Sequence, residues 1–319
     1  MLTVLIATYN GQRTLREVLS SYCQLESPVG GWKLVIVDNG STDATKEIIC
    51  SFMSCLPLTY VFEPLRGKNA ALNLGLASAE GDLIAFSDDD ASPRPDWLIE
   101  MRRAADFHPA FSIFGGTVVA HWEIPPEDWI FQCVPLGPVF AVTDPNWEEG
   151  PVEPGFAFGV NMGIRAEIFD AGYRFNVDIG PGRACAMGSE TELNLRLAKA
   201  GFKVWHSKRA VVEHLIPKSR MHRSWTLDRA SIFGREQYRL RGRYEHAKDK
   251  FYFGVPWQLI KSIARTGLRT GTAALELDSV GAFSNIWEFR YLLGQAHEAR
   301  VGLPRPTSVE DLGTESDRS

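Results

Sequence analysis

Three consecutive carboxylates, Asp88, Asp89 and Asp90, directly follow the apolar residues 83–86 in the stretch LIAFSDDDASPRPDWL. Neighbouring negative charges repel each other, so a solvated turn explains one such aspartate better than it explains three. Mg²⁺ and Mn²⁺ prefer oxygen ligands, and they typically take one or two carboxylates and leave positions for phosphate oxygens and water. We therefore expect a divalent cation at this cluster, and with it a diphosphate.

The first hundred residues alternate between strand-like and helix-like segments. Apolar runs at residues 3–8, 33–38, 58–63 and 82–90 predict strands, and residues 11–24, 41–53 and 70–79 have helical spacing. Ser41 or Thr42 is the expected N-cap of the second helix. Near-continuous apolar strands that alternate with helices are typical of an α/β protein with a doubly wound, mostly parallel sheet and helices on both faces.

Polar residues follow three of these predicted strands: Thr8-Tyr9-Asn10, Asp38-Asn39 and the aspartate cluster. Doubly wound sheets bind ligands beyond the carboxyl ends of their strands, near the point where the strand order reverses. The sequence therefore predicts one site that these three loops share.

The pattern changes from about residue 111. Residues 111–124 predict two strands or one bent strand, and a Pro- and Trp-rich loop follows to about residue 154. We expect a loop into a short helix at 155–173, a helix from 188 to Gly201 and a strand pair at 203–215. Trp122 and Trp129 in the loop suit either stacking on a sugar or capping of a core.

Composition narrows the function classes. The chain has 319 residues, 45% of them hydrophobic and 23% charged, and a net charge of −5, which argues against a general nucleic-acid binder. Five scattered cysteines contain no C-x-x-C pair, so we expect neither a zinc site nor a disulfide framework, and we expect a reducing compartment. The N-terminus reads as a strand rather than a signal peptide, which predicts a cytoplasmic protein, with the inner face of the plasma membrane as an alternative. Nothing indicates an oligomeric state.

Six segments in a fixed order resemble the family-2 glycosyltransferases, inverting enzymes with the GT-A fold. They are VLIATYNG, LVIVDNGSTDAT, RGKNAALNLGLASAEGDLIAFSDDD, PRPDWL, GVNMGIRAEIF and GSETELNLRLAKAGF, and they cover residues 2 to about 215. The resemblance implies a Mn²⁺- or Mg²⁺-dependent transfer of a sugar from a nucleotide-diphosphate donor, commonly a UDP-sugar. The acceptor would be the hydroxyl of a sugar or lipid-linked sugar in cell-surface polysaccharide or glycolipid assembly.

The resemblance also implies roles for residues of the donor site. Thr8, Tyr9 and Asn10 would line the pocket for base and ribose, and Asp38 would hydrogen-bond the base. The resemblance also places Asp89 among the donor-binding residues.

The metal site follows from the same resemblance. Asp88 and Asp90 match the D-x-D motif, with Asp90 as the principal metal ligand and Asp88 at the ribose or a metal-bound water. Lys68 is either a phosphate ligand or a solvated loop lysine. His214 either reaches the metal and diphosphate or is satisfied by polar neighbours.

Two glutamates compete for the role of catalytic base. Ser189 and Glu192 have capping-box spacing, and Glu192 lies four residues before Arg196, so Glu192 has a sufficient structural role. Glu190 points about 200° away around the helix, and the helix start favours its ionised form. The family usually has the aspartate of an E-D pair where this chain has Ser189-Glu190. We predict that Glu190 is the base.

The C-terminal part is basic. Residues 218–250 contain ten Lys or Arg and four acids, which predicts either a solvated helical surface or contacts with a diphosphate. In residues 256–269 a basic amphipathic helix carries Trp257 and Leu268 on one arc with Lys261 and Arg265 beside it. Such a helix either packs on the catalytic domain or lies on an anionic membrane.

We therefore divide the chain into four parts by expected role. Residues 1–110 form the nucleotide-sugar-binding half and 111–225 the acceptor-binding and catalytic half of one GT-A domain; 226–300 form a basic helical extension, and 301–319 a disordered tail. A sugar nucleotidyltransferase is disfavoured because TYNGQRTL offers one glycine and one arginine where a phosphate loop would be needed. A non-catalytic sugar-nucleotide-binding partner would be expected to lack the D-x-D pair or the base.

Overall fold

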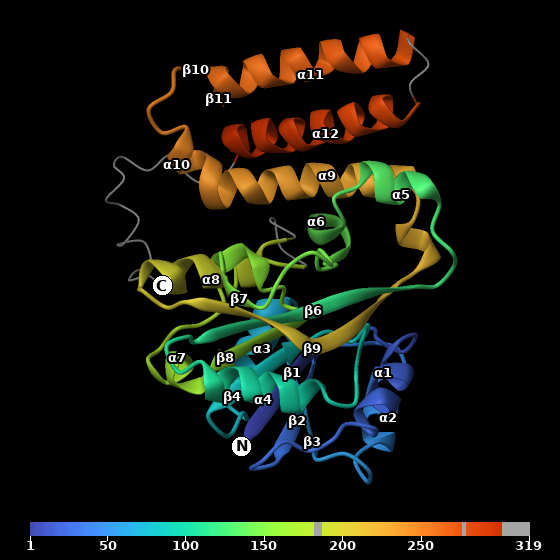
Figure 1. Ribbon diagram of the computed structural model, residues 1–319, viewed down its shortest axis with the longest axis vertical. Coiled ribbons are helices and arrows are strands. Elements are labelled where there is room, and N and C mark those ends of the chain that lie inside the picture. Colours follow the sequence, from blue (N-terminus) through green and yellow to red (C-terminus); the bar gives the residue numbers. More distant parts are fainter. Residues whose placement is uncertain (182–186, 276–278, 302–319) are drawn as a thin grey trace. The chain divides into compact units, whose positions relative to one another are not determined.

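The computed structural model describes residues 1–181, 187–275 and 279–301 (Figure 1). The chain divides into two compact units: residues 1–123 with 140–216, and residues 124–139 with the part that begins at Pro217. Cys185 and residues 302–319 of the predicted tail lie outside the described residues, whereas Val301 ends the last helix.

The first unit begins with four parallel strands in the order β3-β2-β1-β4. They are β1 (Leu2–Thr8), β2 (Trp32–Asp38), β3 (Leu58–Phe62) and β4 (Leu83–Ser87), and the helices α1 (Leu15–Tyr22), α2 (Thr45–Ser51) and α3 (Lys68–Leu76) connect them. The predicted alternation is confirmed. Strand order reverses at β1 and β4, so a ligand crevice is expected beyond their carboxyl ends.

The sheet continues from β4 through β8, β6 and β9 to β5, and β7 also pairs with β9. The bounds are β5 (Ala91–Pro93), β6 (Ile113–Trp122), β7 (Gly150–Val152), β8 (Asn161–Arg165) and β9 (Val204–Ile216). The strand pair predicted at 203–215 is wrong, because β9 is one long strand. The loop predicted before α7 (Ala166–Asp170) contains β8, and the Pro- and Trp-rich segment contains α5 (Asp128–Cys133), α6 (Leu136–Phe140), β7 and the 3₁₀ turn at Pro154–Phe156.

Helices cover both faces of this sheet, as predicted. Apolar side chains of α1, α2 and α4 (Trp97–Phe107) pack against Leu2, Val4 and Ile6 of β1. Those of α3, α7 and α8 (Ser189–Lys199) share the opposite core with Leu5 and Ala7. Alternate residues of β1 therefore serve two cores, which explains why the strand is apolar throughout.

Asn161 fixes the bend in β6. Its fully buried amide donates to the carbonyls of Thr117 (2.9 Å) and Ala210 (2.8 Å) and accepts a hydrogen bond from Trp97 Nε1 (2.8 Å). The pairing of β6 with β9 shifts register between Gly116 and Thr117, where a Cβ on Gly116 would collide with the Asn161 amide. Of the two alternatives for residues 111–124, the bent strand is therefore confirmed.

The second unit is mainly helical. It contains α5, α9 (Arg223–Gln237), α11 (Trp257–Leu275) and α12 (Ser279–Val301), the short turns at Lys218–Arg220 and Tyr238–Gly242, α10 (Arg243–Glu245), and a hairpin of β10 (Phe251–Tyr252) and β11 (Val255–Pro256). Helix α12 packs against both α9 and α11 (Figure 1). No helix of the described residues is long and apolar enough to cross a membrane.

Several basic residues of this unit have structural partners. Glu298 on α12 is only 2% exposed and accepts ion pairs from Arg235 (3.1 Å) and Arg239 (2.7 Å) on α9. Arg223 lies 5.4 Å from the rings of both Trp129 and Phe283, which themselves pack edge to face. Capping of a core by Trp129 is thus confirmed, and Arg223, Arg235 and Arg239 of the basic segment connect α9 with its neighbouring helices.

Gly75 of α3 offers a test of how tightly the first unit is packed. A Cβ there would lie 2.7 Å from Val37 Cγ2 and closer still to Leu5 Cδ1. We expect Gly75→Ala to lower the melting temperature, because overpacking costs about 1–3 kcal/mol and outweighs the ~1 kcal/mol gain in helix propensity. Thermal unfolding followed by circular dichroism measures the change.

Gly271 of α11 is the matched control, because a Cβ there would meet nothing within 4 Å. Gly271→Ala should therefore raise stability by about 0.5–1 kcal/mol. A Gly75→Ala variant that gains as much as Gly271→Ala would contradict the close packing of α3 on β1 and β2.

Candidate active site

The loops after β1 and β2 are tied together by hydrogen bonds. The Asn10 backbone N–H donates to Ser41 Oγ (2.9 Å), and the Thr42 N–H donates to Asn10 Oδ1 (2.9 Å). Asn10 adopts a left-handed conformation (φ +52°), which asparagine tolerates better than most residues. The predicted N-cap at Ser41 or Thr42 is therefore wrong: Asp43 accepts from the Thr45 N–H (3.1 Å) at the start of α2 instead.

Asp38 is held rigidly at the end of β2. Its side chain is 2% exposed and accepts hydrogen bonds from the Ser41 N–H (2.8 Å) and the Tyr60 hydroxyl (3.0 Å). Burial, and then the adjacent Asp38 charge, raise the pKa of Tyr60 to about 12, so Tyr60 stays a neutral donor. A fixed carboxylate thus lies beside the loop that carries Thr8, Tyr9 and Asn10.

Asn39 positions the segment that leads into α3. Its amide accepts from the Gly67 N–H (2.8 Å) and donates to the Leu65 carbonyl (2.6 Å). This loop also places the Arg66 guanidinium 3.3 Å from the centre of the Tyr9 ring, so the exposed tyrosine is stacked on its neighbour. Arg66 was not predicted to belong to the site, although it stands two positions before Lys68 in RGKN.

The three aspartates after β4 have three different partners in space. Asp88 forms an ion pair with Lys68, Asp89 accepts a hydrogen bond from Thr8 Oγ1, and Asp90 lies beside His214. Burial, followed by the neighbouring charges of Asp90 and Asp88, raises the pKa of Asp89 to about 7. The structure therefore relieves part of the repulsion by separating the carboxylates among these partners.

Lys68 is not a solvated loop lysine. Burial alone would lower its pKa, but the Asp88 carboxylate, with smaller effects from Glu190 and Asp90, outweighs burial and raises the pKa. Lys68 is therefore fully charged near neutral pH, and the carboxylates of Asp88, Glu190 and Asp90 all stabilise its charge.

His214 on β9 is buried, and its imidazole bridges two groups. Nδ1 lies 2.7 Å from the Phe140 carbonyl, and Nε2 lies 3.4 Å from Asp90 Oδ1. Burial would lower the pKa of His214, whereas Asp90 raises it, and the net shift is upward. Because a carbonyl can only accept, Nδ1 donates its proton to the Phe140 carbonyl. Nε2 faces the Asp90 carboxylate, and the two groups can hold a proton or a metal cation between them.

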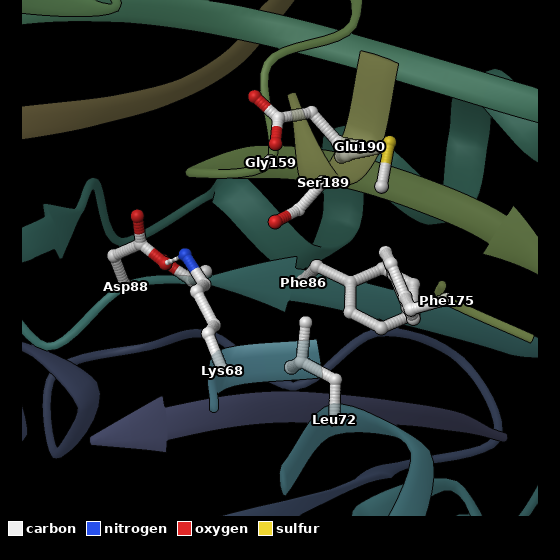
Figure 2. Close-up of a pocket in the computed structure, with 10 residues that line it drawn as sticks. Lys68, Leu72, Phe86, Asp88, Gly159, Phe175, Ser189 and Glu190 are labelled. Atoms are coloured by element: carbon white, nitrogen blue, oxygen red, sulfur yellow. Dashed lines mark hydrogen bonds and ion pairs between the residues drawn. The ribbon is translucent and has the colours of Figure 1, made fainter. Parts of the chain in front are cut away.

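Glu190 and the Lys68–Asp88 pair line one pocket. Figure 2 shows Lys68 and Asp88 on one side and Ser189 and Glu190 of α8 on another. A Cβ on Gly159 would lie 3.4 Å from the Glu190 carboxyl group, which is ordinary contact distance, so the Gly159 backbone lies directly beside this carboxylate. The pocket thus brings a cation, an aspartate and a candidate base together beyond β4.

The two glutamates of α8 differ as predicted, although not through a capping box. Gly188, with φ +93°, takes the N-cap position and no side chain caps the helix, so the predicted capping role of Ser189 is wrong. Glu192 instead forms a two-point ion pair with Arg196 (2.7 and 3.0 Å).

Two buried polar atoms near this pocket were not predicted. Ser189 Oγ and Asn69 Oδ1 have no hydrogen-bond partner among the residues that the structure describes. A buried polar group without a partner is costly, so these atoms mark positions where a bound hydroxyl or water would be stabilised. Ser189 gave a misleading signal because serine before an acidic helix turn usually indicates a cap.

Comparisons with known proteins agree with this architecture. Residues 3–170, more than half of the chain, match the family described as Glycosyl transferase family 2. The succinoglycan biosynthesis protein ExoM of Rhizobium meliloti is 24% identical over 274 residues, which cover 85% of this chain and 83% of that protein. The glycosyltransferase AglE of Haloferax volcanii is 32% identical over 98 residues, but the match spans only 32% of AglE and 30% of this chain.

A solved structure gives the fold independently. The mannosyltransferase PcManGT of Pyrobaculum calidifontis, determined with GDP-Man and Mn²⁺, has a TM-score of 0.61 and 20% identity, and the likeness covers 95% of this chain and 88% of that one. At this identity the likeness supports the fold alone, which is of the GT-A type. Together with the family match, it shows that this chain is a glycosyltransferase that belongs to glycosyl transferase family 2.

Proposed function

We propose that this enzyme transfers a sugar from a nucleotide-diphosphate donor, with a UDP-sugar as the expected form, to an acceptor hydroxyl with inversion at the anomeric carbon. The observation that carries the proposal is the convergence of Lys68, Asp88 and Glu190 on one pocket at the strand-order reversal. The same edge holds Asp90 and His214. Phosphate neutralisation and base catalysis are thereby available side by side.

The donor would bind across the ends of β1, β2 and β4. Thr8, Tyr9 and Asn10 would line the base and ribose pocket, with Asp38 hydrogen-bonded to the base. Asp89 would contribute by accepting the hydrogen bond from Thr8 Oγ1, which holds the Thr8 side chain in place. Support for the donor class comes from PcManGT, whose structure contains GDP-Man.

The residues present fit a divalent cation such as Mn²⁺ or Mg²⁺. Asp90 and His214 Nε2 present two facing donor atoms, and Asp88 lies in the same turn. Within the described part of the chain, no three acidic, histidine or cysteine side chains converge closely enough to enclose a metal by themselves. A site with few protein ligands suits a cation that also binds phosphate oxygens, and such a cation would neutralise the departing diphosphate.

The side chains supply the remaining chemistry. Lys68, charged and held by Asp88, would stabilise negative charge on the leaving nucleoside diphosphate. Glu190 would take the proton from the acceptor hydroxyl as its oxygen attacks the anomeric carbon from the side opposite the leaving group. A single displacement of this kind needs no covalent enzyme intermediate.

The acceptor is proposed to be a sugar or a lipid-linked sugar in polysaccharide or glycolipid assembly. ExoM, which matches over most of its length, is a succinoglycan biosynthesis protein. We assign donor binding to residues 1–110 and acceptor binding with catalysis to residues 111–225, because Glu190 comes from the latter segment. Cytoplasmic location is part of the same proposal.

The cation site is tested by Asp90→Ala. We expect Mn²⁺-dependent binding of UDP or GDP, measured by calorimetry, to weaken strongly and turnover to fall at least about 100-fold, because a metal ligand is lost. The control is Asp96→Ala, which removes an exposed aspartate at the start of α4 that makes no capping hydrogen bond. Wild-type metal-assisted binding in Asp90→Ala would refute the assignment.

The base is tested by comparing Glu190→Gln with Glu192→Gln. Glu190→Gln should keep the KM for the donor and lose about 10²–10⁴-fold in kcat, because only proton transfer is impaired. Glu192→Gln should keep its turnover and lose about 0.5–1 kcal/mol of stability, because it weakens the ion pair with Arg196. An inactive Glu192→Gln beside an active Glu190→Gln would reverse the assignment.

A further inference from the structure

An exposed apolar surface lies along the β10–β11 hairpin and the outer side of α11 in the second unit. We call it the hairpin surface, and its members are Tyr252, Phe253, Trp257, Ala264 and Leu268. Phe253 is 92% exposed, Leu268 74%, Tyr252 47% and Trp257 44%. Scattered single apolar residues are ordinary on a surface, but several on adjacent elements indicate an interaction site.

Phe253 at the tip of the hairpin lowers the stability of the folded state in two ways. Phe253 (φ +51°) and Gly254 (φ +79°) both adopt left-handed conformations, as in the tight two-residue turns that favour Asn-Gly. A bulky aromatic residue is strained there, and this one is also almost fully exposed to water. Folding of the hairpin therefore does not account for a phenylalanine at this position.

Helix α11 has two distinct apolar sides. Leu259 and Thr266 are buried, while Trp257, Ala264 and Leu268 lie on the opposite side of the helix at 100° per residue. The helix thus satisfies its packing inside the unit and still presents an apolar stripe outward. Ile260 and Ile263, which belong to the same predicted arc, pack against the core of this unit, so packing accounts for part of the arc and leaves Trp257, Ala264 and Leu268 to be explained.

A groove continues this surface between the hairpin, α11 and α12. It has a volume of about 380 Å³ and is lined by apolar side chains, among them Val255, Ile260, Ile263, Leu293 and Ala296. Arg300 and His297 also line it, so it combines an apolar wall with basic groups. Such a groove suits an acyl chain whose headgroup stays near the cations.

Four basic residues lie around the hairpin surface. Lys250 precedes the hairpin, Lys261 and Arg265 flank the apolar stripe of α11, and Arg300 packs its stem against Gly254. None of these four forms an ion pair with another residue in the described ranges, in contrast to Arg235 and Arg239, which share Glu298. In a chain with a net charge of −5, this local positive charge complements an anionic partner.

We propose that the hairpin surface docks on an anionic lipid bilayer, with Phe253 and Trp257 at the boundary between headgroups and acyl chains. A single lipid could fill the groove and contact Phe253, which lines it, but it would leave Trp257 and Leu268 exposed. A flat bilayer covers the tip and the helix side together while the lysines and arginines meet its phosphates. The proposal is independent of the donor chemistry above and would bring the enzyme to lipid-linked acceptors.

Co-sedimentation of the full chain with vesicles tests the proposal. We expect binding to phosphatidylcholine vesicles that contain phosphatidylglycerol, weaker binding to phosphatidylcholine alone, and release at high salt. Lys261→Gln and Arg265→Gln should each weaken binding about fivefold. Phe253→Asn should weaken it about tenfold, because an apolar anchor is lost.

Phe253→Asn also separates docking from misfolding. The change creates an Asn-Gly turn, so the melting temperature should stay or rise while vesicle binding falls. Phe107→Asn removes an equally conspicuous exposed aromatic residue at the end of α4 and should leave vesicle binding unchanged. Turnover of Phe253→Asn on a water-soluble acceptor should equal that of the wild type.

Three results would overturn the proposal. The first is equal binding to neutral and anionic vesicles, and the second is undiminished vesicle binding by Phe253→Asn. The third is a wild-type protein that does not bind vesicles but forms dimers, which Phe253→Asn abolishes. The last result would assign the surface to a second copy of the chain. Vesicle binding by a wild-type protein that transfers no sugar would refute the proposed function and leave this proposal standing.

Discussion

The repulsion among Asp88, Asp89 and Asp90 is the constraint around which the first unit is arranged. Each carboxylate has a partner from a different part of the chain: Lys68 from α3, Thr8 from β1 and His214 from β9. The strand order at β1 and β4 brings Lys68 and Thr8 to the aspartates, and the pairing of β5 with β9, in which Ala91 lies opposite His214, brings His214 to Asp90. The sheet therefore determines how far apart the charges lie and which of them faces a ligand.

The supporting hydrogen bonds explain why so many polar residues are buried nearby. Asn39 holds the loop before Lys68, and Asn161 holds the bend of β6 against β9, the strand that carries His214. Both asparagines use donor and acceptor groups at once, so an apolar or acidic replacement would leave buried backbone groups without partners. Their function is to position the site, and we assign them no contact with a substrate.

Much of the site could be predicted because its residues stand next to strong local signals. Asp88 and Asp90 follow an apolar strand, and helical geometry separated Glu190 from Glu192. Predictions failed where a side chain has a non-local partner. Ser41 accepts a hydrogen bond from the Asn10 backbone rather than capping a helix. Gly188, not Ser189, occupies the N-cap position of α8. His214 became a candidate only through the family resemblance, because its proximity to Asp90 spans 124 positions and no local spacing could reveal it.

The central claim is that a divalent cation at the Asp88–Asp90 turn holds the donor diphosphate. The most direct measurement is calorimetric titration of the wild-type protein with UDP and with GDP, in Mn²⁺ and after its removal by a chelator. We predict that one nucleotide binds at least about tenfold more tightly with Mn²⁺, because the cation offsets repulsion between diphosphate and carboxylates. Equal affinity with and without the metal, in a folded protein that binds the nucleotide, would contradict the claim.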